Sequence, residues 1–103
     1  MASFVNDAKA TGHLVAILKA LAHPARLRIV ATLCRSQESV GALAQLLEIE
    51  PAIVSQQLRI LRMQGLVDVA RSEGLAIYSL SRPELKTLVA CLEKCPESRG
   101  RSV

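Results

Sequence analysis

The first third of the chain carries apolar residues at every third or fourth position, a spacing that places them on one face of a helix. The pattern predicts a first helix over about residues 6–22 and a second over about residues 24–35, with a break at His23-Pro24. The two helices are expected to pack together through their apolar faces. These faces comprise Ala10, Leu14, Ile17, Leu18 and Leu21 in the first helix and Leu27, Val30, Leu33 and Cys34 in the second.

Two further helical segments follow, separated by a short turn. Ser39 can cap the first of them, over residues 40–47. The second begins with Pro51, which suits the first helical position, and ends at Gly65, which suits the position after the last turn. The inward positions should be Val40, Leu43, Leu46 and Leu47 in the first segment and Val54, Leu58 and Leu61 in the second. The arrangement predicts a helix-turn-helix unit, whose second helix reads the major groove of DNA.

After Gly65 the pattern becomes nearly alternating. Residues 66–80, with a turn at Ser72-Glu73-Gly74, are predicted to form a β-hairpin, and a hairpin directly after a reading helix is a wing. Ser81 can cap a last helix that ends before Pro96. Its apolar stripe comprises Leu85, Leu88, Val89 and Leu92.

We therefore predict a mainly α fold with a β-hairpin wing, a winged helix-turn-helix with four helices, two strands and a fifth helix. The 103 residues should form one DNA-binding domain over residues 1–96, followed by a polar tail, residues 97–103, that is expected to be disordered. A domain of this size leaves about a third or more of its surface unburied, so a partner subunit would stabilise it.

Composition narrows the class of function. The net charge of +4 and the pI of about 9.3 favour nucleic acid as a partner over acidic substrates. We find no nucleophile and base pair and no phosphate-binding loop, so we do not expect an enzyme. No apolar run approaches the ~20 residues of a membrane span, and the first residues do not resemble a secretory signal, so the expected location is the cytoplasm without membrane contact.

The second face of the predicted reading helix should point outward. It comprises Ala52, Gln56, Arg59 and Met63, flanked by Ser55 and Arg62. Arg59 and Arg62, together with Arg71 on the wing, are candidates for contacts to DNA phosphates. The alternative is that these three are ordinary solvated surface arginines.

In order and spacing, four segments of the chain resemble the ArsR/SmtB family of winged-helix bacterial repressors, and the resemblance covers roughly residues 14–92. The segments are LKALAHPARLRIV at 18–30, SVGALAQLL at 39–47, VSQQLRILRMQGLV at 54–67 and IYSL at 77–80. The resemblance implies a homodimer that is joined by its first and last helices. It also implies a repressor that binds an inverted repeat in its own promoter and is released by an inducer.

The family's base-reading positions correspond here to Pro51, Ala52, Ser55 and Gln56. The Gln56 amide can bond adenine through two hydrogen bonds, and Ser55 can bond a base edge or a phosphate. Pro51 and Ala52 can offer only apolar contact, such as to a thymine methyl group. On the wing, Leu75 stands where a basic residue is common in the family, which predicts a weaker contact with the minor groove.

The resemblance also bears on the inducer. Relatives that bind metals at the third helix carry cysteines where this chain has Ser39 and Gly41, so that site is absent. The last helix has no histidine, so the site of the zinc-binding relatives is absent as well. Sulfur- and oxidant-sensing relatives pair one cysteine of the second helix with one near the end of the last, and the placement here is similar but shifted. The cysteines of this chain are Cys34, Cys91 and Cys95.

Three readings of these cysteines remain open. The thiolates can bind a soft metal or a trivalent metalloid ion such as arsenite, or they can undergo oxidation or persulfidation. Alternatively, Cys34 packs in the core and the Cys91 and Cys95 pair has no sensing role. A winged-helix module that binds a protein, without a sensing role, is the alternative function.

Overall fold

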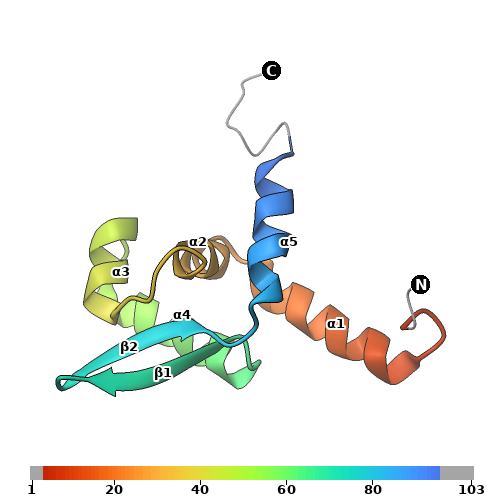
Figure 1. Cartoon of the computed structure of the whole chain (residues 1–103), viewed down its shortest axis with the longest axis horizontal. Helices are drawn as coiled ribbons and strands as arrows, with labels where there is room; N and C mark the ends of the chain where they lie inside the picture. The colour runs from red at the N-terminus through yellow and green to blue at the C-terminus, as the bar shows by residue number, and fades with distance from the viewer. Residues whose placement is uncertain (1–3, 96–103) are drawn as a thin grey trace.

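The computed structural model describes residues 4–95 and contains the helices and the hairpin in the predicted order (Figure 1). The elements are α1 (Ala8–Leu21), α2 (Pro24–Leu33), α3 (Val40–Leu47), α4 (Pro51–Met63), β1 (Val67–Ser72), β2 (Leu75–Leu80) and α5 (Glu84–Glu93). The winged helix-turn-helix fold is therefore confirmed. The predicted tail, residues 97–103, lies outside the described residues.

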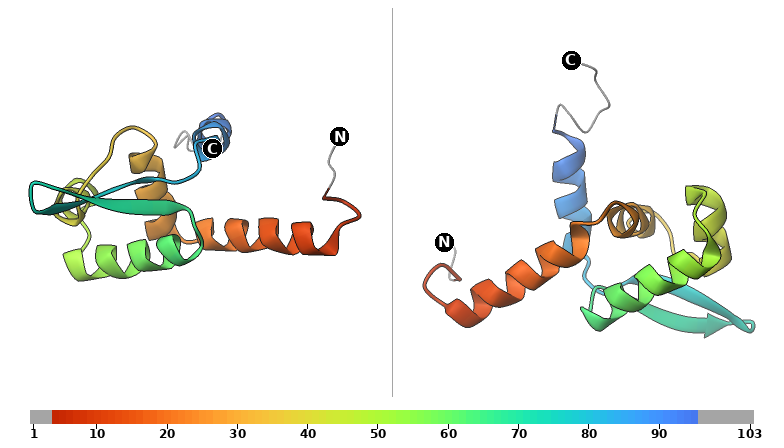
Figure 2. Two further views of the ribbon diagram at one scale, coloured as in Figure 1. Left: turned by 60° about the horizontal axis from the view of Figure 1, so that its bottom comes forward. Right: turned by 180° about the vertical axis from the view of Figure 1, so that it is seen from behind.

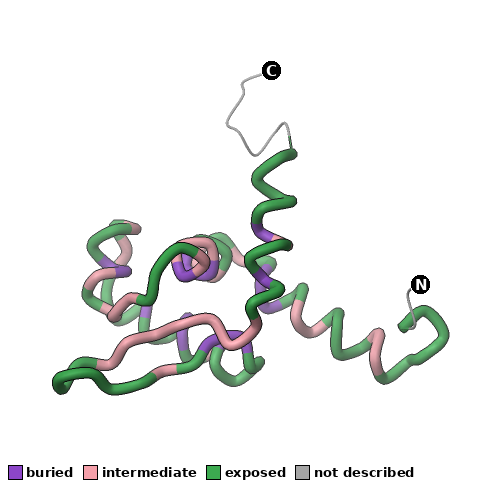
Figure 3. The backbone as a smooth tube through the Cα atoms, viewed as in Figure 1, coloured by how far each residue is buried: buried purple, intermediate pink, exposed green. Residues whose placement is uncertain are grey.

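The core lies where α2, α3 and α4 meet the root of the wing. Buried positions gather on these elements, whereas the outer parts of α1 and α5 project from the body (Figures 1 and 3). The largest fully buried side chains are Ile29, Leu43, Leu58, Leu61, Leu66, Val30, Val54 and Val67. All eight are branched aliphatic residues that pack closely, and the half-buried Tyr78 packs against them.

Local side-chain hydrogen bonds set the starts of three helices. Asp7 accepts bonds from two backbone amides of the first turn of α1, which starts that helix two residues later than predicted. Nδ1 of His23 accepts from the amide of Ala25 at 3.1 Å and caps α2. Ser39 caps α3 through a bond from the amide of Ala42, also at 3.1 Å, as predicted.

The wing is a two-stranded antiparallel sheet whose turn is Glu73-Gly74, with φ of 54° and 80°. Two consecutive positive φ values form the tight turn that matches the twist of paired strands. The root of the wing is bonded to the loop before α3. The amide of Glu38 donates to the carbonyl of Tyr78 at 3.1 Å, and the amide of Tyr78 donates to the carbonyl of Glu38 at 2.8 Å. The wing is thus attached to the helix-turn-helix unit through β2.

Gly65 follows the last turn of α4 and has a φ of 74°. Nothing lies within 4 Å of the position that a Cβ would take, so only the backbone conformation requires glycine. We expect Gly65→Ala to lower the free energy of unfolding by about 1–2 kcal/mol, measured by urea denaturation. Gly12→Ala is the matched control, because Gly12 lies in open space inside α1 and should gain about 0.5–1 kcal/mol. Equal stabilities of the two variants would contradict this account.

The predicted apolar faces are not buried at five leucines, which are exposed in the structure: Leu14, Leu18, Leu27, Leu46 and Leu92. In α1 the reason is that the helix points away from the body, so only Ala20 and Leu21 of its last turn are buried (Figure 2). In α2 and α3 the helices are rotated relative to the prediction, and Ile29 and Ala44 are buried instead.

The predicted capping role of Ser81 is also wrong. The helix begins at Glu84, three residues later, and Pro83 takes the capping position without a side-chain hydrogen bond. The amide of Ser81 instead donates to the carbonyl of Leu66 at 2.9 Å, which closes the end of the wing onto its start. Among the described residues, no helix is long and apolar enough to cross a membrane.

Candidate nucleic-acid interface

The outward face of α4 carries the predicted DNA-reading side chains. Ala52, Ser55 and Gln56 are exposed, while Val54, Leu58 and Leu61 on the opposite face are buried. The buried stripe therefore fixes which side of the helix faces solvent. In two views α4 lies beside the wing along the same edge of the molecule (Figures 1 and 2). A reading helix and a wing on one edge can contact one DNA duplex together.

Positive charge is concentrated on the second half of this helix. Arg59 and Arg62 are exposed, and neither guanidinium group is paired with another group in the described part of the chain. The first half follows the exposed acidic residues Glu48 and Glu50. Unpaired arginines are available for phosphate oxygens, so the geometry favours phosphate contacts toward the end of α4.

The third predicted phosphate contact, Arg71, lies near the tip of the wing. Its Nη1 donates to the carbonyl of Gly74 at 2.9 Å, so the side chain is folded across the turn. Leu75 is exposed next to this turn, at the position where the family commonly has a basic residue. The guanidinium retains other donors for a phosphate, but it is held to the wing and does not extend freely.

A pair of residues that the sequence analysis missed holds α4 in place. Gln57 is buried, and its Oε1 accepts a bond at 3.0 Å from Nη1 of Arg26 in α2. The Nε of Arg26 donates to the carbonyl of Ala20 at 2.6 Å. The signal was present in the sequence, because position 57 belongs to the same helical stripe as Val54 and Leu58.

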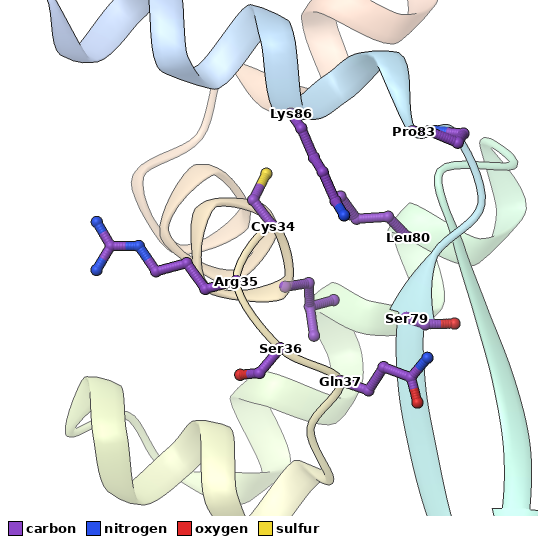
Figure 4. Close-up of a pocket in the computed structure, with 9 residues that line it drawn as sticks. Cys34, Arg35, Ser36, Gln37, Ser79, Leu80, Pro83 and Lys86 are labelled. Atoms are coloured by element: carbon purple, nitrogen blue, oxygen red, sulfur yellow. The ribbon is translucent and has the colours of Figure 1, made fainter.

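Cys34 caps the end of α2 and borders a hollow of about 230 Å³ between α2, the end of β2 and the start of α5. Its sulfur points toward α5, and Lys86 reaches down from that helix beside it, whereas Arg35 points away (Figure 4). Burial raises the pKa of the Cys34 thiol. The charge of Lys86 opposes this rise in pKa, Glu93 adds to it and Arg35 opposes it.

The other two cysteines lie elsewhere. Cys91 is exposed on α5, and Cys95 lies two residues beyond Glu93, where the helix ends. The prediction that both lie within the last helix is therefore wrong for Cys95. Neither residue lines the hollow at Cys34, and no cluster of three His, Cys, Asp or Glu side chains able to hold a metal ion occurs among residues 4–95. One chain in this conformation does not assemble a site of three thiolates.

The raised pKa of Cys34 predicts a specific pH dependence of its alkylation. Thiolate is the form that reacts with iodoacetamide. The pH at which the reaction rate rises should therefore be higher for the folded chain than for the urea-unfolded chain. The measurement uses a Cys91→Ser/Cys95→Ser background, in which only Cys34 reacts, and compares the midpoints of the two pH profiles. Slower access to the half-buried sulfur lowers the rate at every pH, but it does not move the midpoint. The midpoint therefore reports the pKa. A folded midpoint at or below the unfolded one would contradict the prediction.

Comparison with known proteins agrees with the fold. Residues 23–69 match the family described as bacterial regulatory protein, arsR family. The biofilm growth-associated repressor of Agrobacterium fabrum is 41% identical over 76 residues, which cover 74% of this chain and 65% of that protein. The transcriptional activator HlyU of Vibrio cholerae is 37% identical over 89 residues, which cover 86% of this chain and 79% of that protein.

Solved structures give the same picture in three dimensions. The transcriptional repressor BigR from Xylella fastidiosa superposes with a TM-score of 0.78 at 36% identity, over 84% of this chain and 91% of that one. A winged helix-turn-helix domain of Mb0332 from Mycobacterium bovis, described as homodimeric, superposes with a TM-score of 0.75 at 27% identity, over 90% and 87%. The chain therefore belongs to the ArsR family of DNA-binding transcriptional regulators, which are not enzymes.

Proposed function

We propose that this chain is a homodimeric repressor that binds an inverted-repeat operator with α4 in the major groove. The observation that carries the proposal is the exposed face of α4, where Ser55 and Gln56 lie beside Arg59 and Arg62. The amide and the hydroxyl supply base contacts, and the guanidinium groups supply phosphate contacts. Ala52 adds an apolar contact at the start of the helix.

The proposed dimer interface is formed by α1 and α5. Both helices project from the body, and a hollow of about 290 Å³ lies between them. Its apolar lining comprises Leu14, Ile17, Leu18, Leu85 and Leu88. Leucines exposed on a single chain lose contact with water when a second copy covers them. A two-fold axis through this interface would place the two α4 helices about one DNA turn, ~34 Å, apart, which matches an inverted repeat.

Release from DNA is proposed to act through the cysteines, by soft-ion binding or by thiol oxidation or persulfidation. Cys34 supports this because its sulfur faces α5, a helix of the proposed dimer interface. Arg35 and Glu93 also join the ends of α2 and α5 by an ion pair at 3.7 Å. A modified or ligated Cys34 would change the distance between these helices and hence the dimer geometry. A solved structure described as reduced HlyU superposes at a TM-score of 0.77, and its description concerns the redox state of that protein.

A binding titration on the promoter DNA upstream of the chain's own coding sequence tests the proposal. We expect reduced protein to bind the promoter duplex more tightly than a scrambled duplex, with an affinity that falls as salt rises. As(III), Cd(II) and a persulfide donor are then added separately, and one of them should release the DNA. Mass spectrometry distinguishes a bound ion from a disulfide or polysulfide bridge.

Cysteine variants supply the control for sensing. Cys34→Ser, and separately Cys91→Ser/Cys95→Ser, should keep DNA binding and lose release by the active agent. If none of the three agents changes DNA binding, the proposed sensing role is wrong but the proposed repressor function stands. Absence of promoter binding, with retained binding to a protein partner, would instead favour the winged-helix interaction module.

A further inference from the structure

The reading helix α4 is joined to the last turn of α1 by one chain of hydrogen bonds through Arg26. The Nε of Arg26 donates to the carbonyl of Ala20 at 2.6 Å, and its Nη1 donates to Oε1 of Gln57 at 3.0 Å. Gln57 is the one polar side chain that is buried among residues 4–95. A buried amide needs a partner, so Arg26 is required wherever α4 keeps Gln57 inside.

This bridge lies at the point where α1 is attached to the body. Of the fourteen residues of α1, only Ala20 and Leu21 are buried, and the carbonyl of Ala20 is the acceptor of Arg26. A shallow hollow of about 270 Å³, lined by residues of α1 and of the second half of α4, adjoins Arg26. Arg26 itself belongs to α2, which lies between the last turn of α1 and α4 in this bridge. One side chain of α2 therefore bonds both the last turn of α1 and the reading helix.

From this geometry we infer that Arg26 and Gln57 are positioning residues for DNA reading, which fix the rotation of α4 relative to α1. The inference rests on the proposed function, in which α1 forms part of the dimer interface. In a dimer, the angle between α1 and α4 sets the distance and the rotation between the two reading helices. The pair would then determine which spacing of half-sites the repressor accepts.

The apolar contacts of α4 and this bond supply different restraints. The buried side chains Val54, Leu58 and Leu61 determine which face of the helix is turned toward the core, and the bond to Arg26 sets the rotation within that limit. A hydrogen bond to a guanidinium is directional, and Arg26 presents two donors in a fixed plane. Gln56 directly precedes Gln57, so fixing the rotation of the helix at Gln57 also fixes the direction in which the Gln56 side chain leaves the helix.

The test is selection of bound DNA from a library of duplexes with a random central segment, followed by titration. Wild-type protein should enrich a two-fold repeat with one preferred spacing between half-sites. The selected duplex is then compared with duplexes that have one base pair inserted or removed at the centre. The variant Gln57→Met keeps the size of the side chain but lacks the acceptor. Gln57→Glu keeps an acceptor for Arg26, and Gln64→Met makes the same change at an exposed position after α4.

We expect Gln57→Met to reduce the preference for the selected spacing by about tenfold, the effect of one lost charge-assisted hydrogen bond. Gln57→Glu and Gln64→Met should keep the wild-type preference. A purely structural role predicts a different result, namely a lower urea midpoint and equal losses of affinity on all three duplexes. If Gln57→Met fails to fold, Arg26→Lys serves as the second variant, because an ammonium group keeps the charge but lacks the planar pair of donors.

The outcomes separate this inference from the proposed function. The inference is overturned if a folded Gln57→Met or Arg26→Lys variant keeps a spacing preference within about twofold of wild type. If wild-type protein enriches no two-fold repeat, the proposed repressor itself is wrong. Loss of spacing preference with retained binding to a single half-site supports the positioning role directly.

Discussion

Leu58→Ala is expected to lower the free energy of unfolding by about 2–5 kcal/mol, the largest effect on stability of any substitution considered for α4. Leu58 is 1% exposed and lies in the cluster that joins α4 to α2 and the root of the wing. Removing most of its side chain leaves a cavity that the surrounding branched side chains fill only in part. A domain of this size is stable by about 5–15 kcal/mol, so the change removes a large share of the total. Urea denaturation followed by circular dichroism measures it.

Met63→Ala provides the control on the same helix. Met63 is 78% exposed, so its truncation should change the free energy of unfolding by about 0.5 kcal/mol or less. The same two variants also test which face of α4 is inward. Similar losses of stability for Leu58→Ala and Met63→Ala would mean that the helix is rotated relative to the structure.

The second large effect concerns DNA. We expect Arg59→Ala/Arg62→Ala to weaken binding to the promoter duplex by at least about 100-fold at physiological salt, because two charge-assisted contacts per protomer are lost. The dependence of the logarithm of affinity on the logarithm of salt concentration should also become shallower by about 3–4 units for a dimer, which loses about four phosphate contacts. Binding should weaken by a similar factor on scrambled DNA, since phosphate contacts carry no sequence information.

Arg35→Ala is the matched control for loss of charge. Arg35 is an exposed arginine at the end of α2, where it pairs with Glu93 at 3.7 Å, and it is not on the reading helix. Its removal changes the net charge by the same amount per substitution but should leave the salt dependence nearly unchanged. An equal loss of affinity for Arg35→Ala would show that overall charge, and not the face of α4, governs binding.

The fold could be predicted from the sequence because periodicity and turn residues agreed along the chain. Pro51 and Gly65 mark the ends of α4, and the change from helical to alternating spacing after Gly65 marks the wing. The outward face of α4 followed from the same periodicity, since a stripe of branched apolar residues can face only the core. Helix ends, turn residues and the spacing of apolar residues each depend on a few neighbouring positions, so the sequence alone is enough to predict them.

The features that could not be predicted depend on how whole elements are placed. The periodicity of α1 is that of an ordinary amphipathic helix, but its leucines are exposed because the helix projects from the body. The sequence does not show which of the three cysteines borders a cavity. In the structure Cys34 borders a hollow, whereas Cys91 and Cys95 lie outside it. Periodicity shows which residues of one helix share a face. It does not show which other helix, if any, covers that face.

The bonding of Tyr78 to Glu38 at the root of the wing gives the chain a built-in optical reporter. The sequence has no tryptophan and one tyrosine, so ultraviolet-excited emission of the protein arises almost entirely from this ring. Tyr78 is half-buried and bonded through its backbone to the loop that leads into the helix-turn-helix unit. Its emission and its quenching by iodide therefore report on one place, the joint between wing and body. Changes at that joint when DNA binds can be followed without attaching a dye.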